Sequence, residues 1–503
     1  MDSKRSKEVS GILNSGSLVA IGFLISGVLS IATRIVLARF LEPSGYGLIS
    51  EGLAVLNILT VISILGTGAG VSRFMSRNED HRNLVESALT VVLPISFILS
   101  GIALLNLEFI ASFFNQSNIT PVLEALILNV PAAAALSILI GGFRGHEETL
   151  QKVIISMIIL PGLILIMSLS LILISETAAM AAYGYTLAGW TSAFIAGIWY
   201  YARFGIVKPS LQEIKPLLRF SLPLGFKSVL NYGVQWSSII LIGYMLGSSS
   251  TGLFNAAYPI SYGLLAGLSS INYLFMPVIS RMHSNSDLAS VKNIYSNITR
   301  WLLIGTLPLG IFMALKSETI MTLLFGKSYS VAGMLLSVLV VGQFVKVIFG
   351  PLGNILIAVG NTKQEAVAKL CSLIVLILSS IPLISSIGIL GAPMGFVLAS
   401  ITGEVVRLYF SRRHASFNPF NSFDPKIIIG GIIGSIFLIP KGSLIINIFQ
   451  ASGFFIFYLI FILGTGVITE SDIELVESFL KDSIFPEKIW HIPLDISKRI
   501  SNF

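Results

Sequence analysis

Three basic residues interrupt long apolar stretches of this 503-residue sequence: Arg34, Lys227 and Lys346. An ionised side chain in the hydrocarbon interior of a bilayer costs about 3 kcal/mol or more, which makes such residues functional candidates. Lysine and arginine donate charge-assisted hydrogen bonds, and phosphate and diphosphate groups accept such bonds strongly. The three residues therefore predict contact with a negatively charged group inside a membrane.

Each of these cations belongs to a stripe of polar residues. Residues that recur every three or four positions lie on one face of a helix. A polar face on a spanning helix indicates a water-filled cavity or a contact between helices, because lipid cannot satisfy it. The stripes comprise Ser26, Ser30 and Arg34; Lys227, Asn231, Gln235 and Ser238; and Gln343, Lys346, Gly350 and Asn354.

A further polar face carries two tyrosines, Tyr258 and Tyr262, together with Asn255, Ser269 and Asn272. Aromatic rings with hydrogen-bonding groups can stack on sugars and bind their hydroxyls, so this face is a candidate glycan contact. The alternative for the tyrosines is packing between helices. For the asparagine and glutamine residues the alternative is ordinary hydrogen bonding between helices.

Two acidic residues also lie in apolar segments, Glu51 and Glu404. Either residue could carry a coupling proton or form a salt bridge, and the sequence leaves both interpretations open. For Lys346, the alternative to anion binding is an ion pair with Glu404 or another buried acid. For Arg34 and Lys227, the alternative is that the long side chain reaches the lipid headgroups.

The elements that must position these residues are membrane helices. Hydrophobic residues make up 54% of the chain and charged residues 11%, against about 25% charged residues in soluble domains. Apolar stretches of about 20 residues fit helices that cross a bilayer. We therefore predict an all-α polytopic membrane protein with about fourteen transmembrane helices.

The distribution of basic residues predicts the orientation. When the fourteen predicted helices are numbered from the N-terminus, the connecting segments after helices 2, 4, 6, 8, 10 and 12 are rich in lysine and arginine. The N-terminal segment is also rich in these residues. This asymmetry places both termini in the cytoplasm of a protein that spans the cell membrane. The remaining gaps carry only Arg39, Lys316, Lys327 and Lys441.

The sequence contains a weak internal repeat. After a shift of 205 residues, Leu41, Gly47 and Leu48 fall on Leu246, Gly252 and Leu253. The segments 141–149 and 184–190 match 357–365 and 395–401 in the same order. Six helices per copy give both copies one orientation, which predicts two parallel six-helix repeats related by an axis along the membrane normal.

This repeat divides the chain into predicted parts. The parts are a cytoplasmic N-terminus (1–11), six helices (12–203), a cytoplasmic linker (204–219), six helices (220–413), two extra C-terminal helices (426–468) and a cytoplasmic tail (469–503). A tight external turn, built by proline and glycine, is expected in the gap 39–50, "RFLEPSGYGLIS".

Five segments together resemble the polysaccharide-biosynthesis flippases of the multidrug/oligosaccharidyl-lipid/polysaccharide exporter superfamily. The resemblance spans roughly residues 10–470 and implies two six-helix lobes around a central V-shaped cavity. It also implies movement of lipid-linked oligosaccharides from the cytoplasmic to the outer leaflet. The segments are "ARFLEPSGYGLIS" (38–50), "FRGHEETLQ" (143–151), "FSLPLGF" (220–226), "IILIGYMLGSSSTGLFNAAYPISY" (239–262) and "LLFGKSYSVAGMLL" (323–336).

The sign of the buried charge favours one substrate class. Cationic drugs require carboxylates, whereas a polyprenyl phosphate or diphosphate requires Lys and Arg. We therefore expect a flippase for an anionic lipid-linked oligosaccharide, working by alternating access. A cation-coupled multidrug exporter and a flippase for a peptidoglycan lipid are the alternatives within the superfamily. A membrane glycan ligase or polymerase is the alternative from a different class.

The expected partners are the lipid-linked substrate, membrane lipids and the glycosyltransferases or polymerase of the same pathway. The sequence contains no G-x-x-x-x-G-K-[ST] motif, so we expect no built-in ATPase. The five histidines are scattered, without the spacing of metal ligands. We expect no enzymatic activity, cofactor, metal or nucleic-acid partner.

Overall fold

The computed structural model describes residues 2–76, 83–266, 268, 288–358, 360–415, 424–439, 442 and 444–468. Within these ranges the regular structure is helical and no strand is present, which confirms the all-α prediction. Nine helical stretches in this part of the chain are long and apolar enough to cross a membrane. The number of fourteen stays a prediction. Ser269, Asn272 and the predicted tail lie outside the described residues.

The chain forms two compact units. The first comprises Met1–Ala257, Met321–Ala332 and Leu373–Gly395, and the second comprises Tyr258–Ile320, Gly333–Ser372 and Phe396–Phe503. Helix α10 and the start of α11 therefore pack with the N-terminal helices. The predicted boundaries of the two repeats stay a prediction.

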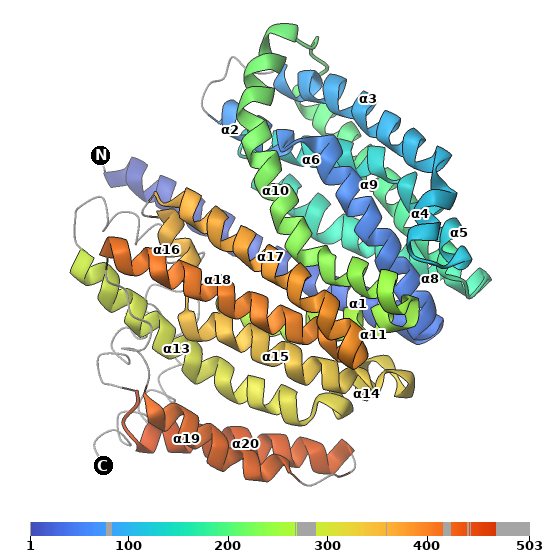
Figure 1. Ribbon diagram of the computed structural model, residues 1–503. Coiled ribbons are helices and arrows are strands. Elements are labelled where there is room, and N and C mark those ends of the chain that lie inside the picture. The colour runs from blue at the N-terminus through green and yellow to red at the C-terminus, as the bar shows by residue number, and fades with distance from the viewer. Residues whose placement is uncertain are drawn as a thin grey trace. The chain divides into compact units, whose positions relative to one another are not determined.

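The first unit is built around α6, whose small residues allow other helices to approach closely (Figure 1). A Cβ atom on Gly141 would lie 2.4 Å from the carbonyl oxygen of Gly68, so α6 and α2 pack backbone to backbone. The helices of this unit are α1 (Asp2–Ile64), α2 (Thr67–Met75), α3 (Leu84–Leu105), α4 (Leu107–Phe113), α5 (Thr120–Ile127), α6 (Val130–Gly145), α7 (Thr149–Val153), α8 (Leu160–Ile174), α9 (Ala178–Phe204), α10 (Leu211–Leu246) and the start of α11 (Ser248–Tyr262).

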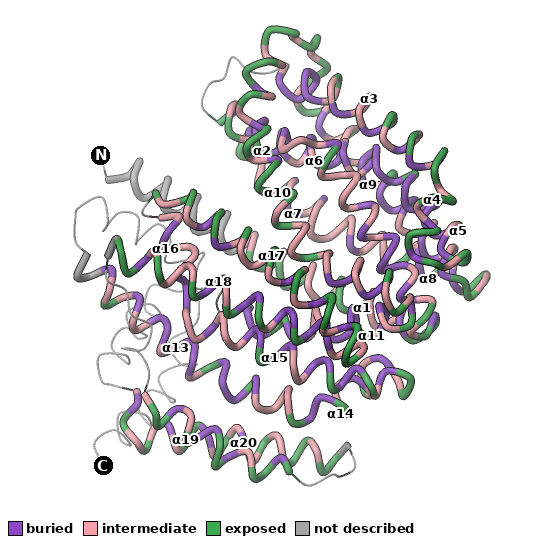
Figure 2. The backbone as a smooth tube through the Cα atoms, in the orientation of Figure 1, coloured by how far each residue is buried: buried purple, intermediate pink, exposed green. Residues whose placement is uncertain are grey.

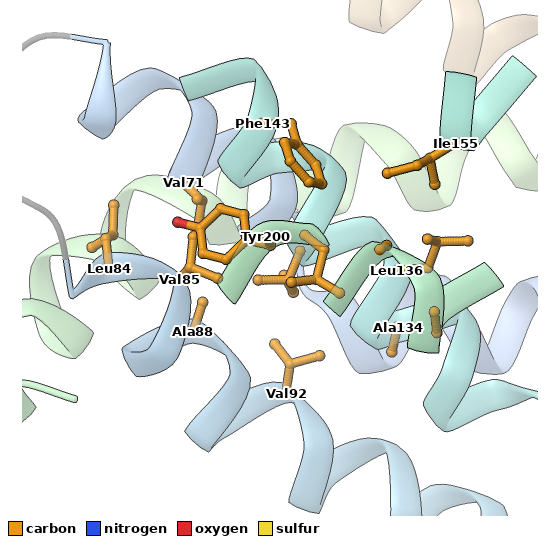
Figure 3. Close-up of a cluster of buried hydrophobic side chains, with 14 of the residues drawn as sticks. Val71, Leu84, Val85, Ala88, Val92, Ala134, Leu136, Phe143, Ile155 and Tyr200 are labelled. Atoms are coloured by element: carbon orange, nitrogen blue, oxygen red, sulfur yellow. The ribbon is translucent and has the colours of Figure 1, made fainter. Parts of the chain in front are cut away.

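An apolar cluster joins these helices on their inner faces (Figures 2 and 3). Tyr200 of α9 is fully buried, and its ring meets Phe143 of α6 edge to face at 5.4 Å. Val71, Val85 and other aliphatic side chains of α2 and α3 complete the cluster. Outward faces of the same helices remain apolar and exposed, as expected for surfaces that contact lipid.

In the second unit, α13 packs on α19 and α20, which lie side by side (Figure 1). Leu303 and Leu307 of α13 share an apolar core with Tyr458 and Ile462 of α20. The remaining helices of this unit, some of which begin or end in the first, are α13 (Leu288–Leu315), α14 (Ser317–Phe325), α15 (Ala332–Phe349), α16 (Leu352–Ala358), α17 (Thr362–Ile387), α18 (Gly391–Ala415), α19 (Pro425–Gly434) and α20 (Leu444–Gly464).

The expected loop across residues 39–50 is wrong in one respect. The helix continues on both sides of a single break at Glu42, which has φ 55° and ψ 179°, and Pro43 opens the next helical segment. The turn is therefore made by a glutamate and a proline. Gly45 and Gly47, which were expected to provide the turn, are inside the helix.

Gly47 instead permits a close crossing with the second copy of the repeated segment. A Cβ atom on Gly47 would lie 1.7 Å from the carbonyl oxygen of Ser248. Reciprocally, a Cβ atom on Gly252 would lie 1.9 Å from the carbonyl oxygen of Pro43. The two segments that match in sequence therefore pack against each other through equivalent glycines.

The helix that carries the stripe of Gln343 and Lys346 is interrupted at Gly350, which has a positive φ of 61°. The chain forms α15 up to Phe349 and α16 from Leu352. The expectation that Gln343, Lys346, Gly350 and Asn354 share one helical face is therefore wrong for Asn354, which belongs to a different helix. Gln343 and Lys346 do share a face of α15.

Candidate anion-binding site

Lys346 lies at the centre of a polar and aromatic cluster in the second unit. Its Nζ donates to Oε1 of Gln343 at 3.2 Å, one helical turn away on α15. The same Nζ lies 4.4 Å from the centre of the Phe396 ring, supplied by α18. Such a cation–π contact stabilises the ammonium group without neutralising its charge.

Gln343 and Tyr258 extend this cluster to α11. Gln343 is fully buried, and its Nε2 donates to Oγ of Ser261 at 3.4 Å. The ring of Tyr258 meets Phe396 edge to face, with the ring centres 5.6 Å apart. The structure thus brings together Lys346, Gln343 and Tyr258, three residues predicted from the sequence to bind substrate.

Tyr262 lies at the edge of this group. Its ring centre is 6.5 Å from that of Tyr258, and the residue is half exposed. The two rings are tilted by 38° relative to each other, so they do not form a parallel stack. Tyr262 thus offers an accessible aromatic ring next to Tyr258.

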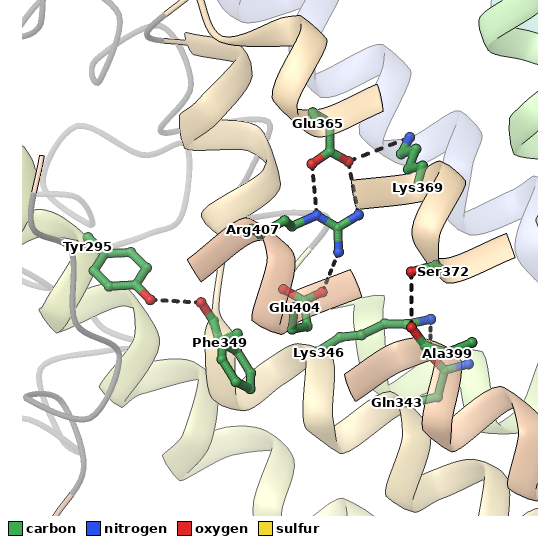
Figure 4. A network of polar contacts seen from close by, with 10 residues as sticks. All are labelled: Tyr295, Gln343, Lys346, Phe349, Glu365, Lys369, Ser372, Ala399, Glu404 and Arg407. Carbon is green, nitrogen blue, oxygen red and sulfur yellow. Dashed lines mark hydrogen bonds and ion pairs between the residues drawn. The ribbon is translucent and has the colours of Figure 1, made fainter. Parts of the chain in front are cut away.

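Glu404 does not pair with Lys346. Its Oε1 accepts a hydrogen bond from Nη1 of Arg407 at 2.6 Å, on the same helix. Arg407 in turn binds Glu365 through two hydrogen bonds of 2.7 and 3.0 Å (Figure 4). Within the described residues, Lys346 has no ion pair. It therefore remains a cation without a carboxylate partner.

Arg34 forms a second cationic cluster, in the first unit. The side chain is half-buried, and its Nη1 lies 3.4 Å from Oη of Tyr46, to which it donates. Asn255 donates to the same Tyr46 oxygen at 3.4 Å and to Oγ of Ser50 at 2.7 Å. No carboxylate of a described residue pairs with Arg34, and the neutral hydroxyl of Tyr46 accepts its hydrogen bond without balancing its charge.

Glu51 lies nearby in this unit and is fully buried. Its Oε1 accepts a hydrogen bond from Oγ1 of Thr251 at 2.7 Å. Its other oxygen finds no hydrogen-bond donor among the described residues. Glu51 forms no salt bridge with a described residue, and both interpretations of this residue stay predictions.

A profile of the polysaccharide biosynthesis protein family matches residues 36–333, more than half of the chain. The chain belongs to the polysaccharide biosynthesis protein family. One relative is the probable low-salt glycan biosynthesis flippase Agl15 of Haloferax volcanii, which is 22% identical over 74% of this chain and 78% of the relative. Another is the capsular polysaccharide biosynthesis protein CapF of Staphylococcus aureus, 24% identical over 54% of this chain and 70% of the relative.

This polysaccharide biosynthesis protein shares its fold with solved structures of membrane transporters. The lipid II flippase MurJ, in an inward closed conformation, superposes with a TM-score of 0.75 over 88% of this chain and 97% of that one, at 16% identity. A multidrug resistance MATE family transporter of the MOP superfamily, facing inward, gives 0.66 over 80% and 98%, at 15% identity. The chain thus has the polytopic transporter fold that the sequence predicted.

The stripe on α10 of this polysaccharide biosynthesis protein is accessible. Lys227, Asn231 and Gln235 are exposed along one face of the helix, whereas Ser238 is buried. Phe226, beside Lys227, is 67% exposed, so the cation is flanked by apolar surface. A face of this composition suits an amphiphile with a charged head.

The sequence analysis singled out neither Arg407 nor Glu365 in this polysaccharide biosynthesis protein. The spacing of Glu404 and Arg407, three residues apart on one helix, was the available signal. Nothing in the sequence pointed to Glu365, whose contact with Arg407 joins α17 to α18.

Proposed function

We propose that this protein is a flippase that moves a polyprenyl phosphate- or diphosphate-linked oligosaccharide from the cytoplasmic to the outer leaflet by alternating access. The observation that carries the proposal is the charge of Lys346, which no carboxylate of a described residue pairs with. Gln343 accepts a hydrogen bond from the ammonium group of Lys346 and the ring of Phe396 lies against it, but neither residue neutralises the charge. A phosphate head supplies the missing negative charge and accepts the charge-assisted hydrogen bonds of the ammonium.

The other polar residues take supporting roles in this proposal. Gln343, Tyr258 and Tyr262 contact the diphosphate and the first sugars beside Lys346. Arg34 on α1 and the stripe Lys227, Asn231 and Gln235 on α10 contact the head at other stages of transport. The polyprenyl tail stays in the bilayer, since its transfer into water is costly.

The names of two relatives, a probable glycan biosynthesis flippase and a capsular polysaccharide biosynthesis protein, support a glycan-linked substrate over a drug. A multidrug exporter for cationic compounds requires available carboxylates, but in the cluster around Lys346 the carboxylate of Glu404 is bound to Arg407. The substrate of a peptidoglycan-lipid flippase also has a phosphate-containing head. The two kinds of flippase therefore differ in the glycan that they move. A ligase or polymerase would change the mass of its substrate, whereas a flippase returns the substrate unchanged.

Lipid-linked glycans are made on the cytoplasmic face and used outside, so the proposal includes a location in the cell membrane. The distribution of lysine and arginine supports an orientation with both termini in the cytoplasm. Glycosyltransferases supply the substrate, and a polymerase or transferase outside consumes it. The membrane potential is one available driving force, because moving one charge through 100 mV changes its free energy by about 2.3 kcal/mol. Glu51 is the candidate carrier of a coupled proton.

The test uses purified protein in liposomes that contain a fluorescent polyprenyl diphosphate-linked oligosaccharide. Wild-type protein is expected to move the label to the opposite leaflet without changing its mass, and Lys346→Ala to abolish this movement. Lys363→Ala is the matched control, because Lys363 is exposed and outside the cluster. In cells, Lys346→Ala should abolish surface glycan export while the protein accumulates normally. Normal movement by Lys346→Ala would contradict the proposal.

A further inference from the structure

Four charged side chains, Glu365, Lys369, Glu404 and Arg407, form one ion-pair network in the second unit, and a fifth, Lys346, lies beside it (Figure 4). Glu365 and Glu404 are negative. Arg407 pairs with both carboxylates, and Lys369 lies 3.9 Å from Glu365. These two cations neutralise the two carboxylates, so Lys346 carries the one charge left over.

Arg407 is held firmly in this arrangement. Its side chain is 15% exposed, and those of Glu365 and Glu404 are 6% and 7% exposed. A Cβ atom on Gly353 of α16 would lie 3.0 Å from Oε2 of Glu365 and 3.1 Å from Nε of Arg407, so α16 packs directly on the ion pair. The planar guanidinium binds Glu365 through two hydrogen bonds and directs a third to Glu404, a geometry that lysine cannot reproduce.

Glu404 is close enough to Lys346 for their charges to interact. Nevertheless, the two side chains point apart: the Lys346 ammonium lies toward Gln343, and the Glu404 carboxylate lies toward Arg407 (Figure 4). A buried carboxylate without a partner is strongly unfavourable. If a neutral residue replaced Arg407, Glu404 would therefore attract Lys346, whose long flexible side chain can reorient.

We propose that Arg407 is a positioning residue that reserves Lys346 for the phosphate head. By binding Glu404, Arg407 prevents the nearest carboxylate from neutralising Lys346. Arg407 does not itself contact the substrate. This inference rests on the proposed function of Lys346 and assigns roles to Arg407, Glu365 and Glu404 in the same network.

The test measures the affinity of the full chain, in lipid nanodiscs, for a fluorescent polyprenyl diphosphate. Arg407→Gln is expected to weaken binding at least about tenfold, because Glu404 then pairs with Lys346. The double variant Glu404→Gln with Arg407→Gln removes the competing carboxylate and is expected to return to within about threefold of wild type. Glu404→Gln alone is expected to bind more tightly than wild type.

A merely structural role for the ion pair makes the opposite prediction, since the double variant would then bind as weakly as Arg407→Gln. That result, or wild-type affinity in Arg407→Gln, overturns the inference. If Arg407→Gln does not fold, as judged by its thermal unfolding, Glu404→Gln decides: tighter binding supports the inference, and equal or weaker binding overturns it.

Lys346→Gln distinguishes this inference from the proposed function. It is expected to weaken binding at least about tenfold. If Lys346→Gln binds like wild type, the proposed role of Lys346 fails, whatever Arg407 does. If Lys346→Gln weakens binding and Arg407→Gln does not, only the role of Arg407 fails.

Discussion

Gly47 and Gly252 meet where the two repeated segments cross, and each faces the backbone of the other segment. The backbone nitrogen of Gly252 lies 3.0 Å from the position of a Cβ on Gly47, and the reciprocal distance is 3.1 Å. The two residues are equivalent in the sequence repeat. A symmetric contact of this kind explains why glycine occurs in both copies, since any side chain would separate the segments.

Gly47→Ala is expected to destabilise the protein. The added methyl group would overlap the carbonyl of Ser248, a backbone atom that cannot move aside cheaply. Overpacking of this kind costs about 1–3 kcal/mol or more. The measurement is the thermal unfolding of purified protein in detergent.

Gly101→Ala is the matched control, because Gly101 is also helical and a Cβ there meets nothing within 4 Å. It is expected to be neutral or to stabilise slightly, since alanine favours a helix by about 1 kcal/mol over glycine. Equal unfolding temperatures for the two variants would show that the crossing is looser than the structure indicates.

The break at Glu42 gives a second prediction. Glu42 has φ 55° and ψ 179°, a region that is essentially restricted to glycine. Its equivalent in the second copy is Gly247, with φ 83° and ψ 176°. Glu42→Gly is therefore expected to raise the free energy of unfolding by up to about 1 kcal/mol, because the relief of strain exceeds the added freedom of the unfolded chain.

Gly247→Ala is the complementary variant and is expected to lower the free energy of unfolding by about 1 kcal/mol or more. A Cβ on Gly247 has room, with its nearest neighbour at 3.4 Å, so conformation rather than crowding would cause this loss. Thermal unfolding again provides the measurement. A loss of stability in Glu42→Gly would mean that a contact of the glutamate side chain stabilises the protein by more than the backbone strain destabilises it.

The sequence alone predicts the helical class and the equivalence of Gly47 with Gly252, because apolar periodicity and repeated spacing are local signals. It also predicts that Lys346 and Gln343 share a face. It does not predict which buried acid pairs with which base, because such contacts join helices far apart in the chain. The sequence left Glu404 as a possible partner for Lys346, whereas in the structure Glu404 binds Arg407. The sequence likewise did not indicate that Thr251 binds Glu51.

Among the described residues, Thr251 donates a hydrogen bond to the buried carboxylate of Glu51. Thr251→Val is therefore expected to destabilise the first unit. The substitution preserves the shape of the side chain but leaves the buried carboxylate without its donor, at a cost of about 1–3 kcal/mol. Thr251→Ser keeps a hydroxyl and should retain more of the stability. Thermal unfolding and the yield of monodisperse protein are the measurements.

Thr306→Val provides the control for this substitution. Thr306 is also buried, but among the described residues its hydroxyl bonds only to the Leu302 carbonyl of its own helix, which already takes part in the helical ladder. Its loss is expected to change stability by less than about 0.5 kcal/mol. If both valine variants behave alike, the bond from Thr251 to Glu51 contributes nothing to stability.

Lys316 provides a polar anchor for α20. Lys316 is 6% exposed, and its Nζ donates to Oδ1 of Asn447 at 2.9 Å and to Oε1 of Gln450 at 2.8 Å. Lys316→Met keeps the length and apolar stem of the side chain but leaves both amide oxygens without this donor. We expect it to lower the free energy of unfolding by about 1–3 kcal/mol and to increase hydrogen exchange in α20.

The same substitution at Lys327, which is exposed, should leave both measurements unchanged. The triple variant Lys316→Met, Asn447→Leu, Gln450→Leu removes the donor and both acceptors together. Replacing a donor together with its acceptors by apolar groups costs less than removing the donor alone, although Asn447→Leu also removes the hydrogen bond from Asn447 Nδ2 to the carbonyl oxygen of Gly442 at 3.0 Å. The triple variant is therefore expected to be more stable than Lys316→Met alone, and exchange in α20 should return toward the wild-type rate. A triple variant less stable than the single one would mean that Asn447 and Gln450 hold α20 through contacts other than those with Lys316.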